Sequence, residues 1–173
     1  DVLNFSVYLK RLCDDSLVQF LTAIGNDSIS QKLHDFLTNE RIDTTLVARS
    51  KNKTIGLYTV ENDETGERSF TYWRSDSAAR KMFHLIDEDL LADVVINANY
   101  FYFTGITLAI IDQPSREKLF CLADRFIKNG KYVIFDPNYR PHLWHDKEDA
   151  RKQIKRAYRS CNILLSSFQD EQN

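Results

Sequence analysis

Glycine is scarce in this chain of 173 residues, and its five glycines are spread so widely that no two fall in one loop. They are Gly25, Gly56, Gly66, Gly105 and Gly130. A Walker loop and a Gly-x-Gly dinucleotide fingerprint both need clustered glycines, because the backbone must approach a phosphate closely. The sequence therefore excludes both motifs from this segment, and a nucleotide-cradling loop of either kind is not encoded here.

Cysteine is equally sparse, since Cys13, Cys121 and Cys161 are odd in number and show no Cys-x-x-Cys spacing. This pattern predicts reduced thiols in the core rather than a disulfide framework. Neither sign of charge dominates, because 23 basic side chains stand against 25 acidic ones and leave a net charge of −2. No basic stripe indicates a nucleic-acid or membrane partner.

Long apolar runs are absent as well. No run approaches the roughly 20 residues that cross a bilayer, and no secretory signal opens the chain. We therefore expect a cytoplasmic protein without nucleic-acid or membrane partners. The 43% of hydrophobic and 28% of charged residues are typical of one soluble domain with a substantial core.

Strands and helices alternate regularly after residue 96. The pattern predicts strands at residues 100–103, 132–135 and 162–165, and helices at residues 115–128 and 147–158. Strand–helix alternation at this spacing is typical of right-handed βαβ units in a parallel sheet. The fold class is therefore α/β, Rossmann-like, with a parallel sheet flanked by helices.

The first half of the chain is less regular. We predict helices at residues 3–12, 28–37, 78–85 and 88–95, with Ser28 as the N-cap of the second, and strands at residues 18–24 and 45–48. Residues 54–60 and 69–73 both look extended, and the polar stretch at residues 62–67 between them indicates a hairpin turn. A hairpin does not fit a doubly wound sheet, so residues 54–74 are expected to project from it.

The most informative motif is Val-Ile-Phe-Asp-Pro-Asn-Tyr-Arg at residues 133–140. In open α/β sheets, ligands bind outside the carboxyl ends of the strands. A strand that ends here would place an acceptor, an amide and a fixed cation at that edge, from Asp136, Asn138 and Arg140. Arginine suits the bidentate capture of a carboxylate or phosphate. The alternative is a capped strand-to-helix turn with a surface arginine.

A second group of candidate binding residues lies on the predicted hairpin. Tyr72 and Arg74 are two residues apart on a strand, so their side chains share a face. If Tyr58 lies on the same face, the three form a hydrogen-bonding wall for a hydroxylated acid. The alternative is cross-strand aromatic packing beside a solvated arginine.

Other candidate sites are weaker. His142 and His145 have a spacing that could suit a metal, but no cysteine or carboxylate completes the set, and Leu143 and Trp144 indicate a packed loop. The sequence has no Gly-x-Ser-x-Gly elbow and no Cys/His pair that would indicate nucleophilic catalysis.

Six segments, in this order, resemble the ribokinase-like (PfkB) sugar kinases. They are residues 1–9, Ala-Ile-Gly-Asn-Asp at 23–27, Gly-Leu-Tyr at 56–58, Phe-Thr-Tyr-Trp-Arg at 70–74, Thr-Gly-Ile-Thr at 104–107 and Phe-Asp-Pro-Asn-Tyr-Arg-Pro at 135–141. The Tyr-Trp-Arg and Asp-x-Asn-x-Arg motifs are most similar to the 2-keto-3-deoxygluconate kinases. The resemblance implies a ribokinase fold whose β-lid covers a sugar acid, and a homodimer formed through that lid. It also implies transfer of the ATP γ-phosphoryl group, with Mg²⁺, to the terminal hydroxyl, giving 2-keto-3-deoxy-6-phosphogluconate.

The resemblance also implies roles for individual residues. Asn4 would belong to the loop and helix that hold the substrate, while Tyr58, Tyr72 and Arg74 would be lid residues that contact it. Arg140 would lie between the substrate and the phosphates.

The phosphate side carries three further positions. Asn138 would lie with Arg140 between the substrate and the phosphates, and Ser167 matches a position near the nucleotide. Ser167-x-x-Asp170 stands where many relatives have Asn-x-x-Glu, a motif linked to magnesium and phosphate. This departure leaves the metal ligands unknown, and the resemblance does not carry a metal role over to Asp170.

Two elements of the family pattern are not in this sequence. Paired glycines are expected before Asp1, and the Gly-Ala-Gly-Asp element with the base aspartate is expected beyond Asn173. Both ends look cut within an element. We therefore expect an incomplete ribokinase fold that lacks the N-terminal strands and the C-terminal nucleotide and catalytic half, and that is inactive alone. Two alternatives stay open, namely a PfkB kinase for another sugar such as fructose or ribose, and a non-catalytic sugar-acid-binding protein.

Overall fold

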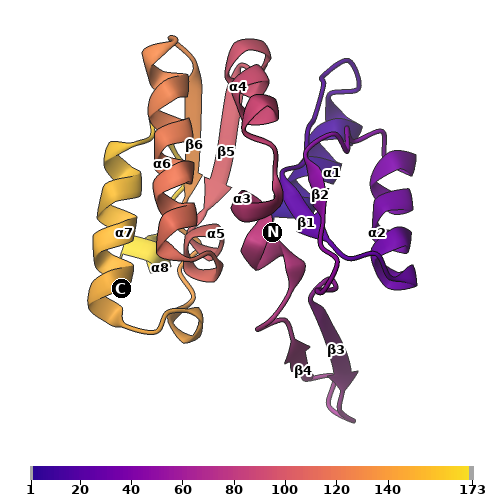
Figure 1. The fold of residues 1–173 in the computed structure, drawn as a ribbon. Helices are drawn as coiled ribbons and strands as arrows, with labels where there is room; N and C mark the ends of the chain where they lie inside the picture. Colours follow the sequence, from indigo (N-terminus) through magenta and orange to yellow (C-terminus); the bar gives the residue numbers. More distant parts are fainter. Residues whose placement is uncertain (1, 172–173) are drawn as a thin grey trace. The chain divides into compact units, whose positions relative to one another are not determined.

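A computed structural model describes residues 2–171, which form two compact units that divide near residue 86 (Figure 1). Each unit contains parallel strands linked by helices, so the predicted α/β class is confirmed. Among these residues, no helix combines the length and the apolar character needed to cross a bilayer. The predicted domain limits at Asp1 and Asn173 lie outside the described residues.

The first unit is a small βαβ arrangement with a hairpin attached. Its elements are α1 (Val2–Leu12), β1 (Thr22–Ile24), α2 (Ser28–Asn39), β2 (Val47–Arg49), β3 (Leu57–Asn62), β4 (Arg68–Trp73), the 3-10 turn η1 (Ala78–Lys81) and α3 (Met82–Leu85). The strands β1 and β2 pair in parallel, and α2 connects them. Val7, Leu37 and Ile42 form a buried cluster between the helices and this sheet. Apolar burial of this kind is the main stabilising term for so small a sheet.

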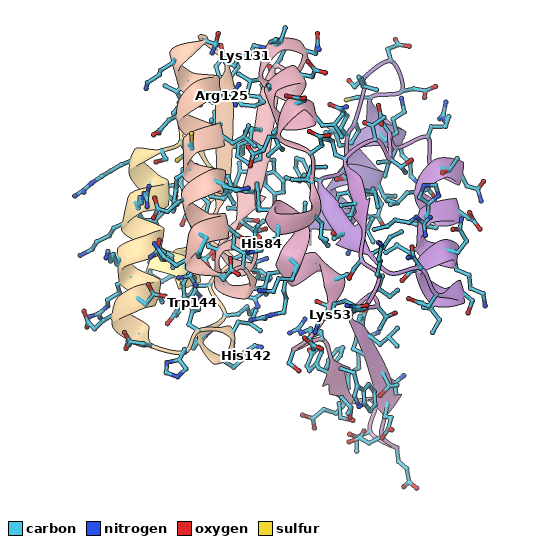
Figure 2. The ribbon with its side chains drawn as sticks, in the orientation of Figure 1. Lys53, His84, Arg125, Lys131, His142 and Trp144 are labelled. Carbon is cyan, nitrogen blue, oxygen red and sulfur yellow. The ribbon has the colours of Figure 1, made fainter. Side chains whose placement is uncertain are left out.

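The hairpin β3–β4 is an antiparallel ribbon in which every residue of both strands is exposed. Its base is closed by the backbone N–H of Ala78, which donates to the carbonyl of Thr54 at 2.8 Å. An ion pair between Lys53 and Asp76 lies at the same place (Figure 2). The tip turns at Gly66, whose φ of 83° is a left-handed conformation that glycine adopts without steric cost. The hairpin is therefore anchored at its base and free along both faces.

The second unit contains a three-stranded parallel sheet in the order β5-β6-β7. Its elements are α4 (Glu88–Asn97), β5 (Tyr100–Thr104), α5 (Gly105–Ile110), α6 (Gln113–Lys128), β6 (Tyr132–Asp136), the 3-10 turn η2 (Pro141–Leu143), α7 (Lys147–Arg159), β7 (Ile163–Leu164) and α8 (Phe168–Glu171). The sheet order follows the chain order, so α6 and α7 are successive crossovers of two right-handed βαβ units.

Aromatic side chains hold the sheet against these two helices. Phe103 and Phe135 are paired residues of β5 and β6, and their ring centroids are 5.0 Å apart. Phe103 meets Phe120 of α6 edge-on, and Phe135 meets Tyr158 of α7 in the same way. Both helices therefore cover the same face of the sheet, and edge-to-face contacts add to the stabilisation that burial provides.

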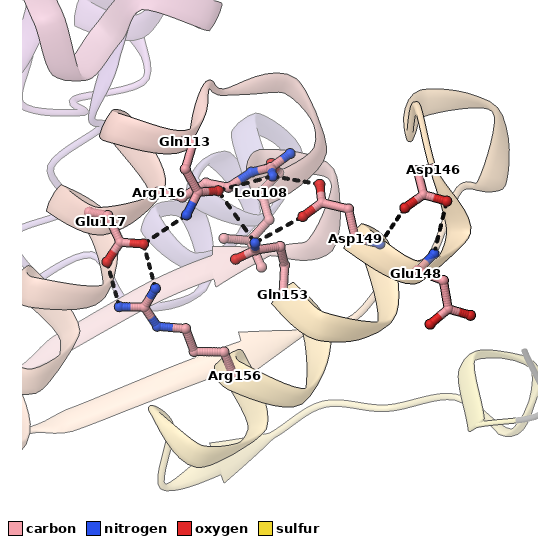
Figure 3. Close-up of polar contacts among 9 residues, drawn as sticks. All are labelled: Leu108, Gln113, Arg116, Glu117, Asp146, Glu148, Asp149, Gln153 and Arg156. Atoms are coloured by element: carbon pink, nitrogen blue, oxygen red, sulfur yellow. Dashed lines mark hydrogen bonds and ion pairs between the residues drawn. The ribbon is translucent and has the colours of Figure 1, made fainter.

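A polar network joins α6 to α7 and to the turn before α7 (Figure 3). The Arg116 guanidinium is buried, donates to the Leu108 carbonyl at 2.8 Å and to Asp149 at 2.7 Å, and lies 5.1 Å from the centre of the Trp144 ring. Arg156 binds Glu117 through two hydrogen bonds, at 2.6 and 2.7 Å. Because Trp144 is anchored in this way, the packed loop predicted around it is confirmed and the segment that follows β6 has a fixed path.

Two predictions of detail in the first unit are wrong. The apolar run at residues 18–24 forms a strand only at Thr22–Ile24, preceded by a single bridge between Gln19 and Asp43. The N-cap of α2 is Asp27 and not Ser28. The hydrogen bonds that the Asp27 carboxylate accepts, chiefly from Ser30, hold the pKa of Asp27 well below its usual range. The cap is therefore charged.

The cysteines also differ from the prediction. All three are free thiols, as expected, but Cys13 and Cys121 are exposed and only Cys161 is half-buried. Burial raises the pKa of the Cys161 thiol. A count of cysteines and their spacing does not reveal how exposed each side chain is, and Cys121 lies on the exposed face of α6.

Candidate functional site

An open cavity of about 630 Å³ lies at the carboxyl ends of β6 and β7, the edge where α/β sheets bind ligands. Its lining residues are Asp136, Asn138, Tyr139, Arg140, Leu165, Ser166, Ser167 and Asp170. The strand β6 ends at Asp136, so its polar motif reaches this edge as predicted. The structure thus brings Asn138, Arg140 and Ser167 together around one cavity.

The turn after β6 has an unusual backbone. Asn138 adopts a φ of 34°, a left-handed conformation that costs a non-glycine residue about 1 kcal/mol. Asparagine tolerates it better than most side chains. The Asn138 N–H donates to the Asp136 carboxylate, which offsets part of that cost. The preceding Pro137 fixes its own φ and cannot continue a strand ladder, so the strand stops here.

The neighbouring helix α5 packs directly against this turn. A Cβ atom built on Gly105, the first residue of α5, would lie 1.9 Å from the Pro137 carbonyl oxygen. Only glycine leaves room for that carbonyl, and Thr104 caps the helix through a hydrogen bond to the Thr107 N–H at 3.3 Å. The Thr-Gly-Ile-Thr segment therefore supports the Asp-Pro-Asn turn from the end of the adjacent strand.

Asp170 braces the opposite wall of the cavity. One carboxylate oxygen accepts the Tyr139 N–H at 2.8 Å, and the other accepts the Ser167 hydroxyl at 2.5 Å and its N–H at 3.2 Å. Burial raises the pKa of Asp170, but the hydrogen bonds from Ser167 and Tyr139 outweigh it and the net shift is downward. Both oxygens of this carboxylate are therefore used to hold two loops together.

Arg140 supplies the positive charge of the cavity. Its Nη1 donates to the Tyr139 carbonyl at 2.9 Å, and its side chain is exposed. The guanidinium has five N–H donors in a fixed fork, so one internal bond leaves capacity for an anionic ligand. The charge of Arg140 favours the ionised form of both Asp136 and Asp170. Arg140 is thus the group of this cavity that could bind an anionic oxygen, while Asp136 and Asp170 hold the surrounding loops.

The hairpin carries the second group of candidate residues. Tyr58 lies directly opposite Tyr72 in the register, with ring centroids 6.0 Å apart. The Arg74 guanidinium carbon lies 4.1 Å from the centre of the Tyr72 ring. The three side chains therefore share one face, with Tyr58 59% and Tyr72 47% exposed. A Cβ on Gly56 would meet the Arg74 Cβ at 2.8 Å, so the glycine leaves space for the arginine.

The two groups belong to different units of the structure, since Arg74 lies before residue 86 and Arg140 after it. The expectation that both arginines face one ligand therefore stays a prediction. Asn4 lies in the first turn of α1, where it is exposed. His142 (Figure 2) and His145 are both exposed after β6. No group of three metal-ligating side chains occurs within residues 2–171.

Tyr102 is the residue of this site that sequence reasoning missed. It lies on β5, two residues before the end of the strand, and its hydroxyl donates to the Asp136 carboxylate at 3.1 Å. The parallel register pairs Thr104 with Asp136, so Tyr102 stands on the same face and reaches along the sheet. Only the pairing of the two strands could have revealed this contact.

A parallel α/β sheet with an anion-suited cavity at its carboxyl edge defines a ligand-binding α/β domain, and the comparison with known sequences specifies which one. The sequence pattern of the pfkB family carbohydrate kinases matches residues 1–172, so the chain belongs to this family. The 2-dehydro-3-deoxygluconokinases of Escherichia coli K12 and Dickeya dadantii are each 40% identical to it over 173 residues, which is 99% of this chain and 56% of theirs. A fructokinase of Klebsiella pneumoniae is 30% identical over 167 residues.

Solved structures agree with this assignment of the fold. A PfkB protein from Polaromonas superimposes with a TM-score of 0.82 at 27% identity, covering 96% of this chain and 54% of that one. The 2-dehydro-3-deoxygluconokinase of Thermotoga maritima also gives 0.82, at 24% identity, over 96% and 49% of the two chains. A fructokinase from Xylella fastidiosa, solved with bound ATP, gives 0.75 at 25% identity, over 93% and 47%. The chain spans about half the length of these relatives.

Proposed function

We propose that the protein containing this chain phosphorylates 2-keto-3-deoxygluconate, also called 2-dehydro-3-deoxygluconate. The γ-phosphoryl group of ATP would pass to the terminal hydroxyl and give 2-keto-3-deoxy-6-phosphogluconate. The 40% identity to two kinases named for this substrate supports the proposal. The observation that carries it is the Tyr58–Tyr72–Arg74 face, because a guanidinium stacked on one phenol and close to a second phenol on the same face suits a carboxylate on a hydroxylated chain.

In this proposal the hairpin is the lid over the sugar acid. Arg74 binds the carboxylate, and the hydroxyls of Tyr58 and Tyr72 bind the keto or hydroxyl oxygens. Stacking on the Tyr72 ring holds the guanidinium plane in place before the ligand arrives. Less side-chain entropy is then lost on binding, which raises affinity. Asn4 of α1, in the same half of the chain, would also help to hold the sugar acid.

The cavity at the end of β6 would bind the phosphoryl group that is transferred. Phosphoryl transfer depends mainly on positioning and on stabilising the charge of a loose transition state. Arg140 and Asn138 would contact the transferred group, and Ser167 would lie near the nucleotide. No catalytic base is assigned within this chain. The Xylella relative with bound ATP supports ATP as the donor.

Magnesium would accompany the ATP, but residues 2–171 do not form a binding site for it. Asp170 uses both carboxylate oxygens for hydrogen bonds within the protein. The part of the chain that the structure describes offers no cluster of three ligating side chains. A divalent cation with near-octahedral geometry needs more oxygen ligands than these residues provide.

A substrate comparison tests the proposed function. With the full-length protein and ATP, we expect kcat/KM for 2-keto-3-deoxygluconate to exceed that for fructose and for ribose by at least about 100-fold. A site built around an arginine leaves that charge unpaired when a neutral sugar binds, which disfavours the sugar. Equal or better turnover of fructose or ribose would assign the protein to another sugar. Binding of the acid with no phosphorylation of any of the three would favour a non-catalytic binding protein.

We also propose that the hairpin pairs with a second copy of the protein. Both strands expose their full length, and Phe70 and Trp73 are 46% and 59% exposed on opposite faces. Exposed strand edges with large apolar side chains are normally covered or paired. We expect a dimer in sedimentation velocity of the full-length protein, and a monomer after Trp73→Glu. A wild-type monomer at micromolar concentration would contradict this part of the proposal.

A further inference from the structure

The carboxylate of Asp136 joins two elements of the cavity. On one side it accepts the hydroxyl of Tyr102, which rises from the neighbouring strand β5. On the other side it accepts the backbone N–H of Asn138, two residues further along its own chain. The carboxylate therefore links the neighbouring strand β5 to the left-handed turn that leads to Arg140.

This link is strongest while Asp136 is ionised, because a charged acceptor holds its donors more tightly than a neutral one. Half-burial raises the pKa of Asp136, and the negative charge of Asp170 on α8 adds to that effect. The hydroxyl of Tyr102 on β5, the Asn138 N–H and the charge of Arg140 act in the opposite direction. These are the titratable and charged groups that face Asp136 from the elements packed around it. Tyr102 is thus one of few groups that favour the charged form.

Tyr102 is well suited to remain a donor. Burial first, and then the adjacent Asp136 charge, raise the pKa of its phenol well above the usual value, so it keeps its proton at every physiological pH. Its ring is half-buried on β5, and its hydroxyl lies 3.1 Å from the carboxylate. A phenol that keeps its proton at this position is a hydrogen-bond donor to Asp136.

We infer that Tyr102 is a positioning residue for the proposed phosphoryl transfer, acting through Asp136 to hold the Asn138 turn and so to aim Asn138 and Arg140 into the cavity. The inference rests on the proposed function for its catalytic consequence, but the hydrogen-bonded chain Tyr102–Asp136–Asn138 can be measured without any substrate. Tyr102 itself touches no reacting atom in this arrangement.

The test is a pH titration of the Asn138 amide by NMR in the full-length protein, comparing wild type with Tyr102→Phe. The amide shift is expected to follow the ionisation of Asp136. Loss of the phenol hydroxyl removes a hydrogen bond that favours the carboxylate, so the midpoint should rise by roughly one pH unit. Tyr132→Phe is the matched control, because Tyr132 lies at the other end of β6 and should leave the midpoint unchanged. An unchanged midpoint in Tyr102→Phe would overturn the inference.

Kinetics then separate positioning from the proposed function itself. Tyr102→Phe is expected to lower kcat about 10-fold with the sugar-acid KM within about 2-fold, because a misaimed Arg140 affects the transition state most. In an Asp136→Asn background the same change should have less than about a 2-fold effect, because the inference routes the effect of Tyr102 through that carboxylate. Additive effects would refute the linkage. A wild-type enzyme without activity on the acid would refute the proposed function, while the amide titration would still decide the inference.

Discussion

Replacing Arg74 with alanine in the full-length protein should reduce kcat/KM for 2-keto-3-deoxygluconate by about 100-fold, equivalent to about 2.7 kcal/mol. The guanidinium is stacked at 4.1 Å on Tyr72 and is the cation placed to meet a carboxylate at the hairpin. A neutral sugar has no carboxylate for Arg74 to bind, so its much lower kcat/KM should change by only a few-fold. Steady-state kinetics with both substrates give the ratio of the loss in kcat/KM for the acid to the loss for the neutral sugar, and this ratio tests the prediction.

Two further variants make this result specific. Arg68→Ala removes an arginine from the first position of β4, opposite Asn62 at the far end of the hairpin, whereas Arg74 directly follows β4; this variant should leave both substrates unaffected. Arg74→Lys keeps the charge but loses the bidentate fork and the stacking, so an intermediate loss is expected. If Arg74→Ala impaired the acid and the neutral sugar equally, Arg74 would have a structural role and the assignment to sugar acids would fail.

Gly105→Ala should be the most damaging single-methyl change in the second unit. The added Cβ would lie 1.9 Å from the Pro137 carbonyl oxygen, a backbone atom that cannot move away by changing rotamer. Either α5 or the Asp-Pro-Asn turn must shift. We expect a loss of about 3 kcal/mol in unfolding free energy, or a fall in Tm of about 10 °C, and a fall in kcat of at least about 100-fold.

Gly66→Ala is the matched control for this prediction. Gly66 has a φ of 83° but open space around its Cβ position, so alanine there meets backbone strain without a clash. A cost of about 1 kcal/mol and nearly normal turnover are expected, since the hairpin tip is remote from the cavity residues in the sequence. Gly105→Ala being no more harmful than Gly66→Ala would show that the turn and α5 adapt to each other, contrary to the packing described above.

The sequence predicted the second unit well because its local signals agree with each other. The helix predicted at residues 115–128 begins at Gln113, with Pro114 in its first turn and Gly130 after its end. The strands at β5 and β6 were placed within one residue. Periodicity, capping residues and turn residues all indicated the same boundaries there.

The first unit shows what local patterns cannot resolve. The apolar residues at 18–21 look like the start of a strand, but strand length depends on how far β2 extends beside them. Asp27 and Ser28 are both good N-caps by composition. Only the folded backbone shows that the Asp27 carboxylate reaches the N–H groups of Ile29 and Ser30.

The candidate site divides in the same way. Asp136, Asn138 and Arg140 could be predicted because they follow directly from the end of one strand. The shared face of Tyr72 and Arg74 followed from the period of a strand, whereas the place of Tyr58 on that face was left open and is given by the register of the hairpin. Tyr102 and Gly105 could not be assigned roles from the residues, because their contacts depend on the register between β5 and β6 and on the packing of α5.

A crystal structure of the full-length protein with 2-keto-3-deoxygluconate would test the central claim most directly. We expect the Arg74 guanidinium to donate to the carboxylate of the bound acid at about 2.8 Å, with Arg140 lining the same cleft on the phosphate side. An acid bound elsewhere, or two guanidinium groups that face separate regions of solvent with no cleft between them, would contradict it.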